Sequence, residues 1–190
     1  MDALTAIHAR RSHSFLADPG PGGDDLAAII SAAAAAPDHG RHRPWRFVVI
    51  RGRGREALGS VFGEAYRKRC AEAGEGSDPA RAERERAKPM RAPVIIAVVC
   101  LAGADEKVPR HERLASAAAA TQNLLLAATA LGYGAMWRTG WPARDPHVKA
   151  ALGLAGGDDI TGFVYLGTAP PGRQPPPDRR DPDGLARTWP

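Results

Sequence analysis

The clearest hydrophobic pattern lies between Val94 and Cys100, where every position is apolar and most side chains are β-branched. A strand that is apolar on both faces belongs in the interior of a sheet. Residues 111–131 are apolar or alanine nearly all round from Leu114 onward, and Gly132 follows them as a typical helix end. We therefore expect a buried central helix beside a sheet that is built around residues 94–100.

Weaker patterns predict the other elements. The spacing of apolar residues favours helices over 1–11, 24–36, 55–73 and 146–152, and strands over 46–51, 135–138 and 160–166. The charged segment 80–88 is typical of a solvated helix or a lid. Seven of the 17 prolines fall within residues 169–190, which cannot form a helix and are expected to form an extended arm.

Composition adds an expectation about assembly. Alanine accounts for 37 of the 190 residues, more than Leu, Ile, Val and Phe together, which account for 34. Alanine favours helices and lets their backbones approach closely, but it supplies little apolar area. We therefore expect a helix-rich chain that completes its apolar burial against a second copy, as a homodimer.

The charge pattern limits the classes of partner. The net charge is +5, and 22 arginines and 4 lysines are scattered among 21 acidic residues. This scatter argues against a nucleic-acid partner, although the guanidinium fork suits a phosphate. The two cysteines cannot make a zinc site by themselves, no signal-peptide pattern opens the chain, and the longest apolar run is about half a membrane span. We expect a cytoplasmic protein with no membrane segment and no metal.

Arg10, Arg11 and Ser12 lie where the first helix is expected to end. Two guanidinium groups and a hydroxyl form a compact donor set for a phosphate or a ribityl chain. The alternative is that these cations merely complement the helix dipole.

The loop 38–45 separates a helix that ends at a proline from a strand, a place where loops often carry binding residues. His39 and His42 do not suffice for a metal site, which needs three or four placed ligands. We expect His39 and Trp45 to form a flat pocket wall instead.

Residues 52–57 match the dinucleotide-binding pattern G-x-G-x-x-A between a strand and a helix. That motif also needs a parallel strand within about 30 residues and an acid about 20 residues on. Here residues 72–78 form a glycine-rich loop and the next strand begins only at Val94, which favours a simple glycine turn over a Rossmann site.

Trp137, Arg138, Thr139 and Gly140 end a core strand. Backbone N–H groups in such a turn can approach a flat heterocycle edge-on, and a glycine permits the close approach. The alternative is a surface arginine after a core tryptophan.

Taken together in their order and spacing, these segments resemble the nitroreductase family, and in particular its short bacterial NAD(P)H nitroreductases. The segments that carry the resemblance are M-D-A-L at 1–4, R-R-S at 10–12, A-P-D-H at 36–39, P-W at 44–45, R-A-P at 91–93, K-V-P-R at 107–110, T-Q-N-L-L-L-A-A-T-A-L-G at 121–132, W-R-T-G at 137–140 and F-V-Y-L-G-T at 163–168. The resemblance covers residues 1–168 as one FMN-binding domain and leaves 169–190 as a proline-rich arm.

The resemblance implies an α+β sandwich, with a central, mostly antiparallel sheet flanked by helices and the C-terminal arm extending onto the partner subunit. It implies a homodimer with FMN at the subunit interface and NADH or NADPH as the reductant. Carried over by position, Arg10, Arg11 and Ser12 would hold the phosphate, the ribityl chain and the pyrimidine edge. His39 would reach the flavin from the other subunit.

The strand end Trp137–Thr139 would contact the flavin, with the amide of Thr139 or Gly140 near N5 and O4. Hydride transfer would take place at flavin N5, so no side chain is expected to be catalytic. Hydride would pass from NAD(P)H to FMN and then, in a ping-pong cycle, to a nitroaromatic, a quinone or a similar small-molecule acceptor.

The chain departs from many relatives around the flavin. Ser14 and Phe15 stand where a basic residue often follows R-R-S, and Arg41 and Arg43 stand where Asn and Gln often precede P-W. Our hypothesis is that Arg41 or Arg43 supplies the positive charge at flavin N1 and O2. The tail residues that could reach the phosphate are Arg173, Arg179 and Arg180.

Two other functions stay open at this stage. Similar domains carry out dehalogenation or enone reduction, and a fold does not determine a substrate. A basic, non-enzymatic nucleic-acid binder is the alternative from a different class, and it predicts binding that weakens steeply with salt.

Overall fold

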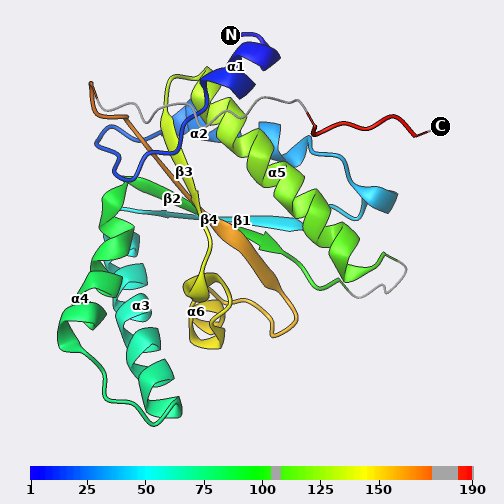
Figure 1. Ribbon diagram of the computed structural model, residues 1–190. Helices are drawn as coiled ribbons and strands as arrows, with labels where there is room; N and C mark the ends of the chain where they lie inside the picture. Colours follow the sequence, from blue (N-terminus) through cyan, green and yellow to red (C-terminus); the bar gives the residue numbers. More distant parts are fainter. Residues whose placement is uncertain (104–107, 173–183, 190) are drawn as a thin grey trace.

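The chain forms a four-stranded antiparallel sheet with helices on both faces (Figure 1). The computed structural model describes residues 1–103, 108–172 and 184–189. In these ranges the strands are β1 (Trp45–Arg51), β2 (Val94–Cys100), β3 (Gly134–Arg138) and β4 (Asp159–Gly167), in the order β1-β2-β4-β3. All three strand pairs are antiparallel, as the predicted α+β sandwich requires.

Strand β2 occupies the interior of the sheet, as its apolar pattern predicts. All seven of its residues are buried, between β1 on one side and β4 on the other. Ile96 lies opposite Val49 of β1 and Val164 of β4. These cross-strand pairs of branched side chains stabilise the sheet where no water reaches it.

Helices α2 (Gly23–Ala34) and α5 (Arg110–Ala130) cover one face of the sheet (Figure 1). The inner side of α5 is buried, whereas Ala115 and Ala130 are exposed and most of its other outward residues are only half-buried. Within a single subunit, the expectation that this helix is buried all round is therefore wrong. The sheet and α2 cover only part of the circumference of α5.

Helices α3 (Arg53–Glu72), α4 (Pro79–Ala87) and α6 (Pro146–Ala151) lie on the other face. Phe62 of α3 packs edge-on against Phe163 of β4, with 5.5 Å between the ring centroids. Helix α4 is less solvated than its charge predicts, since Ala82 and Glu85 are buried and the helix packs along α3.

The glycine-rich segment 52–57 forms a turn, as the sequence favours. Gly52 has a φ of 55°, a left-handed conformation that suits glycine, and it precedes the first residue of α3. Because β1 and β2 are antiparallel, α3 does not complete the βαβ unit that a dinucleotide site needs. The Rossmann alternative is therefore wrong.

The ends of the chain are more exposed. Helix α1 (Ala3–Ala9) lies near α5 and buries only Ala6, while Leu4 and Ile7 are 68% and 46% exposed. Leu185 and Trp189, near the C-terminus, are 79% and 81% exposed. Most of the predicted arm, with Arg173, Arg179 and Arg180, lies outside the described residues. Within the described ranges we find no helix of the length and apolarity that a membrane crossing requires.

Candidate active site

The segment that carries Arg10–Ser12 runs along the edge of the sheet beside β3. Ser12 forms a parallel bridge to Ala135 of β3, and Ala17 forms an antiparallel bridge to Thr168, after β4. The N–H of His13 donates to the carbonyl of Ala135 at 3.1 Å. The structure thus brings the first predicted motif, at 10–12, next to the strand that carries the last one, at 137–140.

The side chains of Arg10 and Arg11 serve different purposes. Arg11 Nη1 donates to the carbonyls of His8 and Arg10, at 2.8 and 3.0 Å, so it satisfies acceptors at the end of α1. Arg10 Nη1 instead donates to Ser12 Oγ at 3.3 Å. Arg10 and exposed Ser12 therefore form the donor pair that can meet a phosphate or hydroxyls, while Arg11 fits the helix-end alternative.

Trp137 and Arg138 point to opposite faces of the sheet, as neighbours on a strand must. Trp137 Nε1 donates to the carbonyl of Thr161 at 3.2 Å, and its ring lies over Gly162, where a Cβ atom would come within 2.1 Å of Nε1. The indole ring thus belongs to the core on the α5 face. Its backbone, rather than its ring, is what β3 presents to a ligand.

Arg138 lies on the α3 face, with its guanidinium carbon 5.4 Å from the ring centroid of Tyr165. Its Nη2 donates to the carbonyl of Ser14 at 3.3 Å, whereas its Nε is buried without a partner. Burial lowers the pKa of Arg138, and the charge of Arg91 lowers it further. Burial also raises the pKa of Tyr165, to about 12.

Thr139 and Gly140 are exposed in the turn that follows β3. Gly140 has a φ of 93°, in a region that L side chains rarely adopt. The turn leads to the 3₁₀ helix η3 (Trp141–Ala143). The turn after β3 is therefore exposed, and the binding of a ligand by its amides stays a prediction.

His39 lies at the opposite end of α5 from Arg10–Ser12. It belongs to the 3₁₀ helix η1 (His39–Arg41), and its Nδ1 forms an ion pair with Glu112 in the first turn of α5. This hydrogen bond raises the pKa of His39, with smaller contributions from the charges of Glu112 and Asp38. The 21 residues of α5 span roughly 30 Å, so one chain does not bring His39 to Arg10.

Arg41 and Arg43 lie in the same loop as His39. Both are exposed and have positive φ values, 56° and 48°, which are uncommon for residues other than glycine. Asp38 stabilises this conformation through two hydrogen bonds. Its carboxylate accepts from the backbone N–H of Arg43 at 2.5 Å, and its carbonyl accepts from the backbone N–H of Arg41 at 3.4 Å. The loop is thus exposed, and like His39 it lies towards the end of α5 that is opposite to the segment 10–12.

Two hollows lie beside the predicted site residues, one near Arg11 and one near His39. One, of about 190 Å³, lies at the C-terminal end of α5 and is lined by Arg11, His13 and Tyr133, among others. The other is an open groove of about 310 Å³ beside His39 and Glu112. Among the described residues, no cluster of three or more histidine, cysteine or acidic side chains is suited to a metal ion.

Sequence reasoning missed Arg91 and Tyr165 as neighbours of Arg138. Arg91 ends the 3₁₀ helix η2 (Lys88–Arg91), and its carbonyl accepts from the N–H of Leu16 at 2.8 Å. Tyr165 lies opposite Met136 in the β3–β4 register. The R-A-P segment at 91–93 was the available signal, but only the fold shows that it lies beside residues 14–16.

The sequence is similar to known proteins over most of its length. Residues 7–168 match the nitroreductase family. The chain is 42% identical over 168 residues to the "Putative NAD(P)H nitroreductase YdjA" of Escherichia coli K12, a match that covers 88% of each protein. It is 32% identical over 169 residues to the "Putative NAD(P)H nitroreductase" of Haemophilus influenzae, covering 88% of this chain and 89% of that protein.

Solved structures share the fold. A nitroreductase-like family protein from Bacillus cereus superposes with a TM-score of 0.81 at 23% identity, over 100% of this chain and 96% of that one. A nitroreductase with bound FMN from Bacteroides fragilis gives a TM-score of 0.76 at 24% identity, over 100% of both chains. These likenesses confirm the predicted nitroreductase-like sandwich.

Proposed function

Because this chain belongs to the nitroreductase family, we propose that it is an FMN-dependent NAD(P)H oxidoreductase. The observation that carries the proposal is the position of the donor pair Arg10–Ser12 beside β3, at Ala135, on the strand that leads to the exposed turn at Thr139 and Gly140. The names of the relatives from E. coli and H. influenzae, and the FMN in the B. fragilis structure, support the same conclusion.

The residues present fit FMN. Arg10 and Ser12 would hold the phosphate and ribityl end, because they offer charged and neutral donors side by side. The amides of Thr139 and Gly140 would hold the edge of the ring, because Gly140 has no Cβ atom to block a close approach and can adopt its positive φ. The buried Nε of Arg138 has no hydrogen-bond partner among the described residues, which leaves one donor at this end of β3 unmet.

A second copy of the chain would complete the site. The roughly 30 Å that α5 places between His39 and Arg10 means that His39 can serve this site only from the other subunit. Exposed Leu4, Ile7 and Leu131, near the C-terminal end of α5, offer apolar surface for such an interface. Arg41 and Arg43 would come from the same subunit as His39 and would place positive charge near N1 and O2 of the flavin.

When bound, FMN would supply two-electron hydride chemistry between NADH or NADPH and a nitroaromatic, a quinone or a similar small acceptor. The protein's part is to orient the ring through the amides after β3. The cations at positions 41, 43 and 138 would stabilise negative charge there. The turn at 139–140 and the loop 38–45 of the other subunit would also limit which molecules can stack on the flavin ring.

The test is the visible spectrum of the protein purified without added cofactor. We expect a yellow protein with close to one FMN per chain, which bleaches when NADH or NADPH is added without oxygen. A colourless protein that neither binds FMN nor oxidises NAD(P)H would overturn the proposal. Nucleic-acid affinity that falls steeply with salt would then support the non-enzymatic alternative.

A further inference from the structure

Arg138 and Arg91 form a cationic pair for which the described residues supply no acidic ion-pair partner. Among the described residues, no carboxylate lies within 4.0 Å of either guanidinium group. The two side chains belong to elements on either side of the segment 14–16, because Arg138 donates to the carbonyl of Ser14 and the carbonyl of Arg91 accepts from Leu16. The two charges are close enough for Arg91 to lower the pKa of Arg138.

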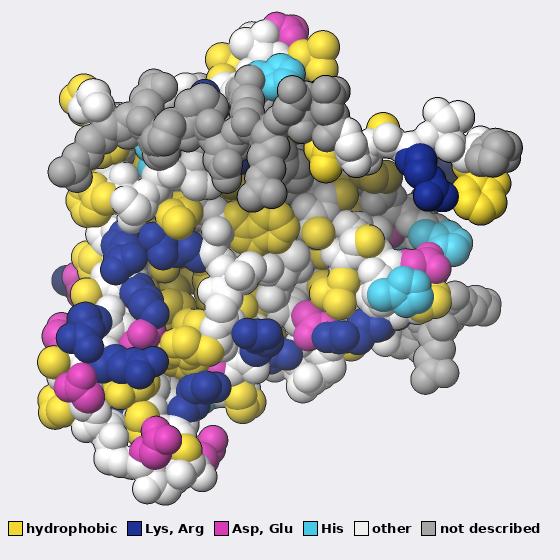
Figure 2. All heavy atoms as spheres, viewed as in Figure 1, with side chains coloured by type: hydrophobic (Ala, Val, Ile, Leu, Met, Phe, Trp, Pro, Cys, Tyr) yellow, Lys and Arg dark blue, Asp and Glu magenta, His cyan; other side chains and the backbone are white. Residues whose placement is uncertain are grey.

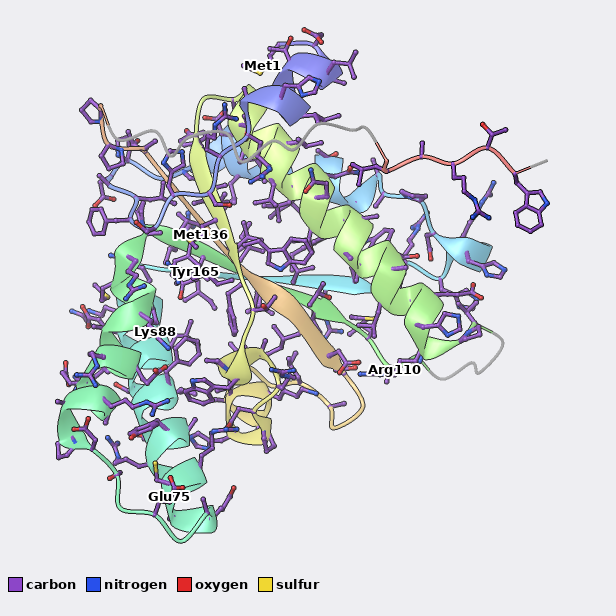
Figure 3. The ribbon with its side chains drawn as sticks, in the orientation of Figure 1. Met1, Glu75, Lys88, Arg110, Met136 and Tyr165 are labelled. Carbon is purple, nitrogen blue, oxygen red and sulfur yellow. The ribbon has the colours of Figure 1, made fainter. Side chains whose placement is uncertain are left out.

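Glu85, an acid whose charge acts on Tyr165, does not balance this charge. Glu85 is buried, and its carboxylate is already ion-paired with Lys88. Figure 3 shows Lys88 and Tyr165 in the region where the end of α4 approaches the sheet. Tyr165 stays neutral because burial raises its pKa to about 12. A half-buried guanidinium beside a second cation is costly, and a bound oxyanion would relieve the cost.

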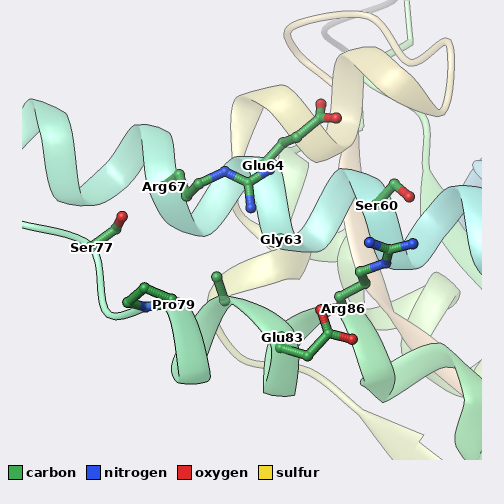
Figure 4. A pocket seen from close by; sticks show the side chains of 9 residues that line it. Ser60, Gly63, Glu64, Arg67, Ser77, Pro79, Glu83 and Arg86 are labelled. Carbon is green, nitrogen blue, oxygen red and sulfur yellow. The ribbon is translucent and has the colours of Figure 1, made fainter.

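On the α3–α4 hairpin, basic and acidic side chains share one surface. Figure 2 shows blue side chains interspersed with magenta ones over the α3–α4 hairpin. The hollow of about 270 Å³ between these helices holds Arg67 and Arg86, but also Glu64 and Glu83 (Figure 4). The hairpin thus places acidic side chains in the same hollow as its arginines, whereas Glu85, the acid whose charge acts on Tyr165, is already ion-paired with Lys88.

The position of Arg138 indicates what kind of anion it meets. Arg138 is three residues along β3 from Ala135, the bridge partner of Ser12, a separation of about 10 Å. If the Arg10–Ser12 pair takes the phosphate end of FMN, Arg138 lies at the level of the ring. Substrates that exchange electrons with a flavin stack at its ring.

We propose that Arg138 and Arg91 form an oxyanion subsite at the end of β3, which binds a carboxylate or phosphate group of the small molecule that approaches the flavin. This inference rests on the proposed function for the identity of that molecule. The two candidate sources of the anion are a carboxylate on the electron acceptor and the 2′-phosphate of NADPH.

The first test measures anion binding without turnover. Benzoate and inorganic phosphate are titrated calorimetrically into wild type, Arg138→Gln, Arg91→Gln and the control Arg67→Gln, which removes the same charge from α3. Loss of a charge-assisted hydrogen bond should weaken binding about 10- to 100-fold in the first two variants, and the control should match wild type. This result is obtained whether or not FMN binds, so it is independent of the proposed function.

The second test identifies the source by ratios measured within each FMN-loaded variant. If the acceptor supplies the anion, both subsite variants lose the preference for 4-nitrobenzoate over neutral 4-nitrobenzamide in kcat/KM. If NADPH supplies it, they lose the preference for NADPH over NADH instead. The proposal is overturned if Arg138→Gln and Arg91→Gln bind both anions as wild type does, if Arg67→Gln weakens binding equally, or if neither ratio changes.

Discussion

At the scale of single residues, the contact between His39 and Glu112 joins a loop to a helix that begins more than 70 positions later. Glu112 raises the pKa of His39, and His39 lowers that of Glu112. Of the groups that face the pair, Asp38 also raises the pKa of His39, and His111 also lowers that of Glu112. The pair therefore keeps its two charges over a wider pH range than either residue would alone.

Because the pKa of His39 is raised on folding, its contribution to stability is complete below the unfolded value of about 6.5 and is lost as the pH rises through the folded value. The contribution of Glu112, whose pKa is lowered, is lost as the pH falls through its own folded value. We predict that Glu112→Gln returns the pKa of His39 towards 6.5, measured by NMR titration of the imidazole. Glu83→Gln, an exposed acid on α4, should leave it where it is in wild type; equal values in wild type and Glu112→Gln would refute the pairing.

At the scale of elements, the α3–α4 hairpin depends on how closely two helices approach. Gly59 of α3 faces the backbone of α4, and a Cβ atom there would lie 2.3 Å from the carbonyl oxygen of Arg86. Gly63, one turn further along, is less crowded, since its Cβ would lie 3.5 Å from the carbonyl oxygen of Ala82. The same substitution should therefore have different effects at the two glycines.

We predict that Gly59→Ala lowers the free energy of unfolding by about 1–3 kcal/mol, because α4 must shift to admit the methyl group. Gly63→Ala should leave stability unchanged or raise it by up to about 1 kcal/mol, since alanine is the better helix former. Urea unfolding of the two variants beside wild type measures both effects. Equal stability of the two variants would show that the hairpin is not closely packed at Gly59.

At the scale of the whole molecule, the elements are predictable where a long apolar pattern specifies them. Strand β2 is found at the predicted residues, and α5 begins and ends within one residue of the expected bounds. The side on which α5 is exposed could not be predicted, because alanine on both faces gives no direction. The difference between Arg10 and Arg11, and the position of Arg91 beside Ser14 and Leu16, depend on tertiary contacts that have no counterpart in the local sequence.

Because of the length of α5, each proposed site would take Arg10 from one subunit and His39 from the other. An Arg10→Ala chain and a His39→Ala chain each impair both sites of their own homodimer. In a mixed dimer one site carries both substitutions and the other carries neither. Random pairing makes about half of the dimers mixed, so co-expression of the two alleles should restore about a quarter of the wild-type NADPH oxidation. A mixture no more active than its parents would mean that Arg10 and His39 do not meet across the interface.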